Sequence, residues 1–299
     1  MTSRNEATRA ERPSMLARSI ILMKPVTWFP PTWAFLCGAV ASGAIFWSVP
    51  NLLNMFLGMV MAGPILCGMS QVINDWYDRD VDALNEPDRL IPSGQVSEQQ
   101  VWTTIVVLVA IGLGIGIYLG RWVSVVVIIG LLLAVAYSAP PFRAKQNGWF
   151  GNALAAISYE GLAWIAGHLA FAALTPQSLL IAALYSLGTH GIMSINDYKS
   201  IDGDIKAGVR TIPVQHGPKG AAWLIVWTMV ISQILVITAF AIWGNVFIAV
   251  VLLGVLVAQV PLQYRFLKDP MGFYLIFSAF GVLIFVIGML IAAIGLRGL

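Results

Sequence analysis

Two short acidic segments carry most of the residues in this chain that could do chemistry. The first follows a long apolar run, and residues 74–82 read Asn-Asp-Trp-Tyr-Asp-Arg-Asp-Val-Asp. The second repeats the Asn-Asp pair, the aromatic residue and the last two aspartates, because residues 196–204 read Asn-Asp-Tyr-Lys-Ser-Ile-Asp-Gly-Asp. A basic turn of one pattern follows each segment, Arg-Leu-Ile-Pro at 89–92 and Arg-Thr-Ile-Pro at 210–213. This self-similarity indicates a chain built from two related halves.

The spacing within each segment predicts which side chains share a face. Successive residues of an α-helix rotate by ~100°, so a helix through the first segment groups four oxygen-bearing side chains: Asn74, Asp75, Asp78 and Asp82. Asp80 points away in the same helix. A helix through the second segment groups another four side chains: Asn196, Asp197, Ser200 and Asp204. Asp202 is the residue that points away there.

These side chains predict a site for a divalent cation. Clustered carboxylates repel one another, and at the end of a helix they also oppose its dipole, so a cation must offset their charge. Oxygen donors without His or Cys suit Mg²⁺, which commonly bridges carboxylates to phosphate oxygens. Basic residues that would surround a bound diphosphate are Arg89, Arg143, Lys145, Lys199 and Arg210. Metal and basic residues together would stabilise the charge on a departing diphosphate.

The elements that must position these segments are membrane helices. The chain of 299 residues is 59% hydrophobic and 10% charged, with a mean hydropathy of +0.82, which polar surface could hardly cover in water. We expect an all-α membrane protein with nine transmembrane helices, because nine apolar stretches approach the ~20 residues that a span needs. They are residues 28–47, 52–73, 101–119, 122–137, 150–173, 179–195, 221–243, 246–262 and 273–294.

The basic residues orient this bundle, because cytoplasmic loops of membrane proteins are enriched in Lys and Arg. Of the 17 Lys and Arg residues, only Arg121 and Arg297 fall on the far side. The sequence therefore predicts a cytoplasmic N-terminal tail over 1–24, a membrane domain over 25–299, and Asp-rich cytoplasmic loops near 74–100 and 196–220. A cation-coupled transporter remains an alternative, although transporters usually place coupling sites near the midplane.

Several strings resemble a known family. The pattern Asn-Asp-x-x-Asp-x-x-x-Asp at 74–82, followed by Asn-Glu-Pro-Asp-Arg-Leu-Ile-Pro-Ser-Gly at 85–94, resembles the intramembrane UbiA prenyltransferase superfamily. Further strings are similar to its chlorophyll and bacteriochlorophyll synthase branch: Trp-Phe-Pro-Pro at 28–31, Gly-Met-Ser-Gln at 68–71, Tyr-Ser-Ala-Pro-Pro-Phe-Arg at 137–143, Asn-Gly-Trp at 147–149, Ser-Tyr-Glu-Gly at 158–161 and Asn-Asp-Tyr-Lys at 196–199. The likeness covers nearly the whole chain.

The resemblance implies a UbiA-type bundle and a reaction. A phytyl or geranylgeranyl diphosphate would be joined to the propionate of chlorophyllide or bacteriochlorophyllide, with Mg²⁺ assistance and release of diphosphate. The bacteriochlorophyll pigment is the preferred acceptor, and another acceptor such as a quinone precursor is the alternative. Because a propionate is already ionised near pH 7, its attack needs no strong base.

The resemblance also assigns roles to residues. The implied metal ligands are Asn74, Asp78, Asp82 and Asp204. Ser200 stands where many family members carry an aspartate, so Asp197 or Asp202 would supply the missing ligand. Arg89, Lys145 and Lys199 would hold the diphosphate. The rings of Tyr137 and Tyr198 would stabilise positive charge on the allylic carbon.

Two further features concern the acceptor and the surroundings. Glu160 falls deep within a predicted span, and it either contacts the acceptor or bonds a neighbouring helix. His168 and His190 either ligate the pigment metal or bond a helix carbonyl. We expect the protein to lie in the lipid bilayer of a bacterial cytoplasmic or photosynthetic membrane and to bind no nucleic acid. Contacts with other pigment-biosynthesis or photosystem-assembly proteins are left open.

Overall fold

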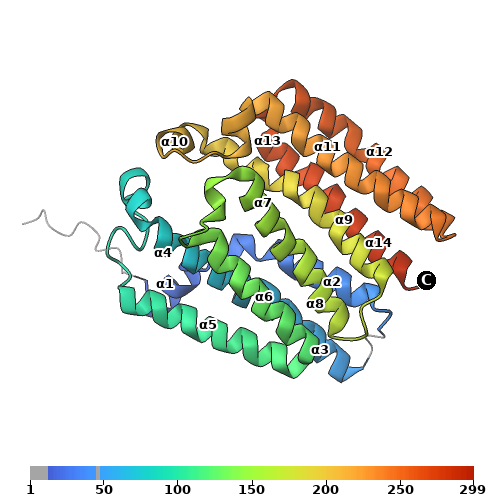
Figure 1. The fold of residues 1–299 in the computed structure, drawn as a ribbon, viewed down its shortest axis with the longest axis horizontal. Helices are drawn as coiled ribbons and strands as arrows, with labels where there is room; N and C mark the ends of the chain where they lie inside the picture. The colour runs from blue at the N-terminus through green and yellow to red at the C-terminus, as the bar shows by residue number, and fades with distance from the viewer. Residues whose placement is uncertain (1–12, 45–47) are drawn as a thin grey trace, which may run out of the picture.

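Helices make up the regular structure of the described residues, 13–44 and 48–299, in a computed structural model of the chain (Figure 1). The N-terminal half contributes α1 (Met15–Leu22), η1 (Pro25–Thr27), α2 (Phe29–Ala41), α3 (Val49–Val60), η2 (Met61–Cys67), α4 (Gly68–Asn85), α5 (Glu98–Leu119) and α6 (Arg121–Ser138). The middle of the chain forms η3 (Ala144–Gln146), α7 (Gly148–Ala156), η4 (Ile157–Leu162) and α8 (Ala163–Leu169). The C-terminal half adds α9 (Pro176–Met193), η5 (Ser194–Lys199), α10 (Ile201–Lys206), α11 (Ile212–Ile242), α12 (Val246–Lys268), α13 (Pro270–Ile276), η6 (Phe277–Gly281) and α14 (Val282–Leu296).

Seven helical segments of the described chain are long and apolar enough to cross a membrane. They are Val49–Ala83, Glu98–Leu119, Arg121–Ser138, Pro176–Lys199, Ile212–Ile242, Val246–Lys268 and Pro270–Leu296. The expected count of nine is therefore not confirmed. Helix α2 has 13 residues and spans only ~20 Å, while α7, η4 and α8 interrupt their apolar run with polar residues such as Asn152, Glu160 and His168. Trp47, at the end of the first expected span, lies outside the described residues.

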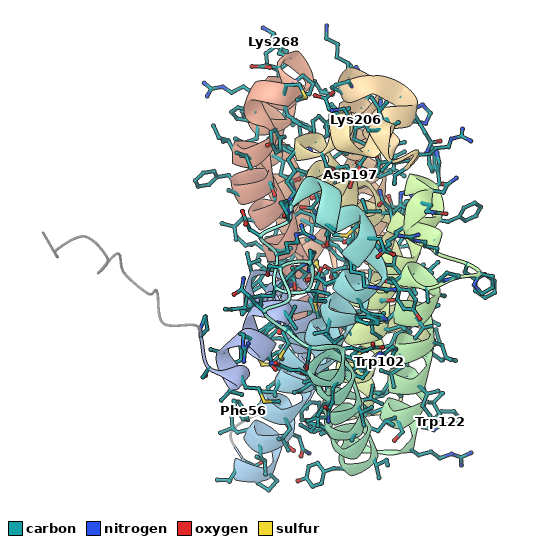
Figure 2. All side chains as sticks on the ribbon, turned by 90° about the vertical axis from the view of Figure 1, so that its left-hand side faces the viewer. Phe56, Trp102, Trp122, Asp197, Lys206 and Lys268 are labelled. Atoms are coloured by element: carbon teal, nitrogen blue, oxygen red, sulfur yellow. The ribbon has the colours of Figure 1, made fainter. Side chains whose placement is uncertain are left out.

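The two halves of the chain lie side by side around one end of the bundle. In Figure 1 the end of α4 and helix α10 both lie at the left, opposite the C-terminus. Figure 2 looks on to that end, with Asp197, Lys206 and Lys268 of the C-terminal half above Trp102 of the N-terminal half. Both acidic segments therefore lie at the same end of the bundle.

Close helix contacts hold the middle of the bundle together. Helices α2 and α8 pack through reciprocal glycines, because a Cβ on Gly38 would collide with the Trp164 carbonyl and one on Gly167 with the Phe35 carbonyl. Small residues of this kind let membrane helices approach backbone to backbone. The fully buried rings of Phe35 and Trp164 then fill the space on either side of this contact.

The later part of the expected N-terminal tail, from residue 13 onward, contains a packed helix. Helix α1 contacts α4 and α5, and Leu22 belongs to a core cluster with Met69 and Val72 of α4. Gln100 of α5 donates a hydrogen bond of 2.9 Å from Nε2 to the Met15 carbonyl. Residues 15–24 thus cover the end of the bundle where the acidic segments lie.

Candidate active site

The first acidic segment lies on α4, which continues through it to Asn85. Its side chains divide as the helical rotation predicts. Asp75 and Asp82 are buried, whereas the side chain of Asp80 is 88% exposed. The prediction of one oxygen-rich face on this segment is confirmed. The segment itself is helical, and only the residues after it form a loop.

Basic side chains from two separate loops converge on this face. Lys145, in the loop before α7, places Nζ 2.6 Å from Asp78 Oδ2 and 2.9 Å from Asn74 Oδ1. Burial lowers the pKa of Lys145, and the neighbouring Asp78 carboxylate opposes that shift. Arg143 donates to Asp78 Oδ1 at 3.2 Å. In the loop after α4, Arg89 reaches Asp82 Oδ2 at 2.8 Å.

The second acidic segment is not one continuous helix, which corrects the expectation of a repeated helical face. The 3-10 helix η5 ends at Lys199, and Ser200 then adopts φ −117° and ψ 6° before α10 begins. The Ser200 hydroxyl donates to the Asp197 carbonyl at 3.2 Å, and such side-chain bonds compete with the helical hydrogen bonds.

Despite this break in the helix, two neighbouring hydroxyl groups hold the Asp204 carboxylate by hydrogen bonds. Asp204 Oδ2 accepts hydrogen bonds from Ser200 Oγ at 2.9 Å and Thr211 Oγ1 at 3.4 Å. Burial raises the pKa of Asp204, and these two hydrogen bonds act in the opposite direction. Asp197 lies close enough to Asp204 for the two carboxylates to repel each other. Asp202 is exposed, as its outlying position predicts.

A short backbone pairing joins the surroundings of the two segments. Asn147 and Arg210 form an isolated parallel bridge, in which Gly148 N donates to the Arg210 carbonyl at 2.8 Å and Arg210 N donates to the Gln146 carbonyl at 2.9 Å. A Cβ on Gly148 would meet Ile212 N at 2.5 Å. The loop that carries Lys145 to the first segment is thereby fixed to the turn that follows the second.

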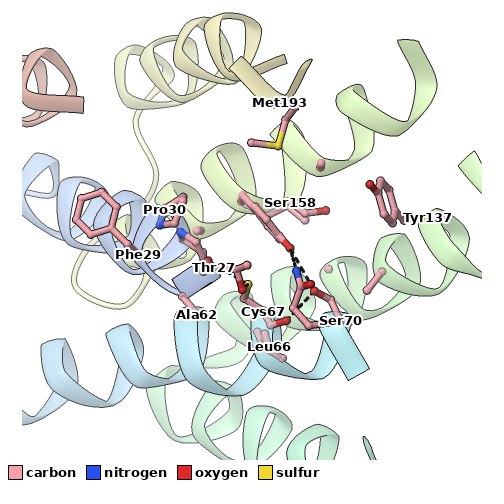
Figure 3. A pocket seen from close by; sticks show the side chains of 18 of the residues that line it. Thr27, Phe29, Pro30, Ala62, Leu66, Cys67, Ser70, Tyr137, Ser158 and Met193 are labelled. Carbon is pink, nitrogen blue, oxygen red and sulfur yellow. Dashed lines mark hydrogen bonds between the residues drawn. The ribbon is translucent and has the colours of Figure 1, made fainter. Parts of the chain in front are cut away.

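A cavity of about 850 Å³ opens beside both segments. Polar residues line one part of it: Lys24, Asn74, Tyr137, Asn196 and Lys199. Apolar residues from α6, α8 and α14 line its depth, among them Val127, Ala166 and Val286. Tyr137 lines the cavity and is close enough to Asp78 and Asp197 to interact electrostatically with both. Figure 3 shows Tyr137, Met193 and Ser158 around this space.

Of the thirteen predicted site residues, Asn74, Tyr137 and Lys199 line the cavity and the other ten do not. Tyr198, Glu160 and Arg210 are three of these ten. The Tyr198 hydroxyl donates to the Pro218 carbonyl at 2.7 Å, and its ring stacks on Tyr274, which argues against contact with an allylic carbon. Glu160 is buried but does not line the cavity. Arg210 is exposed and contributes its backbone to the bridge with Asn147.

The two histidines within spans bond protein groups. His168 lies between Ser178 Oγ at 2.9 Å and the Ala173 carbonyl at 3.1 Å. His190 Nε2 lies 3.1 Å from the Trp149 carbonyl. The His190 contact fits the alternative in which the imidazole bonds a helix carbonyl, since Trp149 lies in α7. The His168 contact is to a carbonyl in the loop between α8 and α9.

Sequence reasoning missed three cavity residues: Lys24, Gln71 and Tyr159. Lys24 Nζ lies 2.6 Å from Asp75 Oδ1, and no local pattern links residues so distant in sequence. Gln71 could have been found, because it precedes Asn74 by three positions and therefore shares its helix face.

The donor atoms at this site fit Mg²⁺. Among the described residues, no three His, Cys, Asp or Glu side chains are grouped so that they could hold a metal ion. The candidate oxygen donors are Asn74, which lines the cavity, and Asp78, Asp82 and Asp204, whose oxygen atoms contact Lys145, Arg89 and Ser200. An open set of this kind suits a cation that keeps several waters and completes its shell with substrate phosphate oxygens.

Comparison with known families identifies the chain. Residues 28–272 match the model of the UbiA prenyltransferase family. The chain belongs to this family. As a UbiA protein it is a prenyltransferase, and the resemblance predicted from the sequence is confirmed.

Relatives place the chain within the UbiA family. The bacteriochlorophyll synthase 34 kDa chain of Chloroflexus aurantiacus is 56% identical over 95% of this chain and 92% of that protein. The chloroplastic chlorophyll synthase of Avena sativa is 44% identical over 91% of this chain and 74% of that protein. The bacteriochlorophyll and chlorophyll synthase branch of the family is thereby supported.

Solved structures agree with the fold. A structure of digeranylgeranylglyceryl phosphate synthase superposes with a TM-score of 0.73 at 19% identity, covering 95% of this chain and 99% of that one. A UbiA homolog from Archaeoglobus fulgidus bound to DMAPP and Mg²⁺ superposes with a TM-score of 0.71 at 22% identity, covering 93% of this chain and 99% of that one. At these identities the likeness shows the UbiA fold alone.

Proposed function

We propose that this protein transfers a phytyl or geranylgeranyl group from its diphosphate to the propionate carboxylate of bacteriochlorophyllide or chlorophyllide. The observation that carries the proposal is the 56% identity, over 95% of the chain, to a bacteriochlorophyll synthase chain. The cavity supports it independently, because a polar mouth followed by an apolar depth suits a diphosphate with a hydrocarbon tail.

The residues at the mouth divide into two sets. Asn74, Asp78, Asp82 and Asp204 would hold Mg²⁺, and Asp197 would add a second-segment oxygen. Arg89, Arg143, Lys145 and Lys199 would surround the diphosphate. The bound Mg²⁺ supplies positive charge that stabilises the leaving diphosphate. In the resting protein these basic groups pair with the carboxylates instead, as Lys145 does with Asp78.

The reaction is a substitution at the allylic carbon. The bond between that carbon and the diphosphate oxygen breaks, and its electron pair leaves with the diphosphate. A propionate oxygen supplies the pair for the new ester bond, so no proton is transferred. The ring of Tyr137, which lines the cavity near both acidic segments, would stabilise the developing positive charge through its π face.

The test is transfer by the purified protein in detergent. Each chlorophyllide is incubated with each prenyl diphosphate and Mg²⁺, and pigment esters are resolved by chromatography. We expect ester formation that EDTA abolishes and added Mg²⁺ restores. Prenylation of a quinone precursor ring without any pigment ester would refute the proposed acceptor. Ion flux in proteoliposomes without diphosphate release would refute the enzyme assignment.

A further inference from the structure

A polar patch interrupts the apolar wall of the cavity below the metal site. It consists of Ser70 and Gln71 on α4 and Tyr159 on the π-helical segment η4, and all three line the cavity. Ser70 and Gln71 precede Asn74 by about one turn of α4, which places them about 5 Å deeper along the helix axis. Figure 3 shows the hydrogen bonds of this patch between α4 and η4.

The hydrogen bonds within the patch leave donors available. Gln71 Nε2 donates to Tyr159 Oη at 3.0 Å, which uses one of its two amide protons. The Ser70 hydroxyl donates to the Cys67 carbonyl at 2.7 Å. Tyr159 Oη and Ser70 Oγ are 3.4 Å apart, which is long for a hydrogen bond between hydroxyls. Gln71 and Tyr159 also interact with the Cys67 thiol, which is only a weak hydrogen-bond partner. The second Gln71 proton and the Tyr159 hydroxyl proton can therefore be donated to a stronger acceptor on a ligand.

The prenyl donor cannot use these protons. Its only polar atoms belong to the diphosphate, which the basic residues at the mouth surround, and its tail is hydrocarbon. Polar groups covered by hydrocarbon without a partner cost about 1–3 kcal/mol each. The patch is therefore suited to the acceptor, and the matching atom is an acceptor of hydrogen bonds that carries no proton of its own.

We propose that Gln71 and Tyr159 bind a carbonyl oxygen on the ring edge of the acceptor pigment while its propionate lies at the mouth. This inference rests on the proposed function, since it presumes an acceptor with both a carboxylate and a ring carbonyl. Two contacts separated along α4 fix the orientation of a flat ring, because one anchors the reacting arm and the other anchors the ring.

The test compares two pigments in three variants. The pigments are a chlorophyllide and its analogue in which the ring carbonyl is replaced by a methylene group. Gln71→Leu removes the amide at similar volume, and Tyr159→Phe removes only the hydroxyl. Met193→Leu, which changes an apolar side chain lining the same cavity, is the matched control. KM is measured for the pigment and for the prenyl diphosphate.

We expect Gln71→Leu and Tyr159→Phe to raise KM for the carbonyl pigment about 10-fold, as loss of one hydrogen bond predicts. KM for the analogue and for the prenyl diphosphate should stay unchanged, and Met193→Leu should affect neither pigment selectively. This selective loss is the coupling that a merely structural role would not produce.

Two outcomes overturn the inference by itself. An equal rise of KM for both pigments would mean that the patch only joins α4 to η4. A rise of KM for the prenyl diphosphate alone would assign the patch to the donor. Absence of any pigment ester with the unaltered protein would instead overturn the proposed function, and this inference with it.

Discussion

At the scale of single residues, the site consists of carboxylates and basic side chains, several of which contact more than one partner. Asp78 contacts both Arg143 and Lys145, and Lys145 also contacts Asn74. On the proposed function, a substrate diphosphate would replace the carboxylates as partner of these basic groups, which would free the carboxylate oxygen atoms for Mg²⁺. The resting ion pairs therefore keep the charged groups of both sets in place before substrate arrives.

Removing one oxygen from this set should abolish turnover. Asp78→Ala and Asp82→Ala are expected to lower kcat at least about 100-fold, since each removes charge stabilisation of the leaving group. Asp80→Ala is the matched control, because the Asp80 side chain on the same helix is 88% exposed. Elution of each variant as an intact protein in detergent checks its folding. Near-normal activity of Asp78→Ala or Asp82→Ala at saturating Mg²⁺ would contradict the metal-ligand role.

In the second acidic segment, substitutions of Asp197 and Ser200 are expected to differ in their effect on kcat. Asp197→Asn is expected to be far more harmful to kcat than Ser200→Ala, because it removes a charged oxygen beside Asp204. Ser200→Ala removes one of two hydrogen bonds to Asp204 Oδ2, which is worth about 1 kcal/mol and a few-fold in rate. Initial rates at several Mg²⁺ concentrations distinguish the two, and the reverse ranking would refute the ligand role of Asp197.

The sequence predicted which side chains lie together only where a helix continues without a break. The face of Asn74, Asp78 and Asp82 was predictable because α4 continues without a break. Tyr198 follows the Asn-Asp pair as Trp76 does, yet its ring packs against Tyr274 in the core. Lys24 approaches Asp75 across the fold, and such a tertiary contact leaves no local signal.

At the scale of elements, widened helices shape the cavity. Three π-helical segments, η2, η4 and η6, occur in the described chain. Each contributes to the cavity wall, through Cys67, Tyr159 and Ser278 among others. Pro64 within η2 cannot donate a backbone hydrogen bond, which accounts for one of these departures. The other two, η4 and η6, contain no proline, so apolar periodicity does not predict this cavity.

The bridge between the two segments can be tested through its glycine. Gly148→Ala is expected to destabilise the protein by about 1–3 kcal/mol, as overpacking does, because the new Cβ would meet Ile212 N. It should also raise KM for the diphosphate, since Lys145 would lose its position. Gly203→Ala, on α10 with nothing within 4 Å of the added Cβ, is the control. Thermal unfolding in detergent and initial rates measure both effects, and equal behaviour of the two variants would contradict a linking role for the bridge.

At the scale of the whole molecule, hydropathy predicted the membrane class. Seven of the nine expected spans match helical segments of the described chain that are long and apolar enough to cross a membrane, and the expected spans at 28–47 and 150–173 are not confirmed. Helix α2, within the first of these two, has 13 residues and packs against α8 through Gly38 and Gly167. The uneven distribution of basic residues between the two ends, which the sequence predicts, is also found in the structure. Among the described basic residues, only Arg121 and Arg297 lie at the end opposite the site.

That asymmetry predicts the orientation of the molecule in the membrane. Because Lys and Arg are enriched on the cytoplasmic side, the end that carries both acidic segments should face the cytoplasm. Asp202→Cys places a thiol at that end, and Ala173→Cys places one between α8 and α9 at the opposite end, with both positions exposed. The native Cys37 and Cys67 are buried, so they should contribute little background labelling.

A membrane-impermeant maleimide then reads the orientation in sealed vesicles. In inside-out vesicles we expect labelling at position 202 and protection at position 173, and in right-side-out vesicles the reverse. Labelling of both positions in one vesicle type would contradict the assignment of these two ends to opposite faces. A reversed pattern would place the site outside, where a diphosphate made in the cytoplasm could not reach Lys145 and Arg89 without first crossing the membrane.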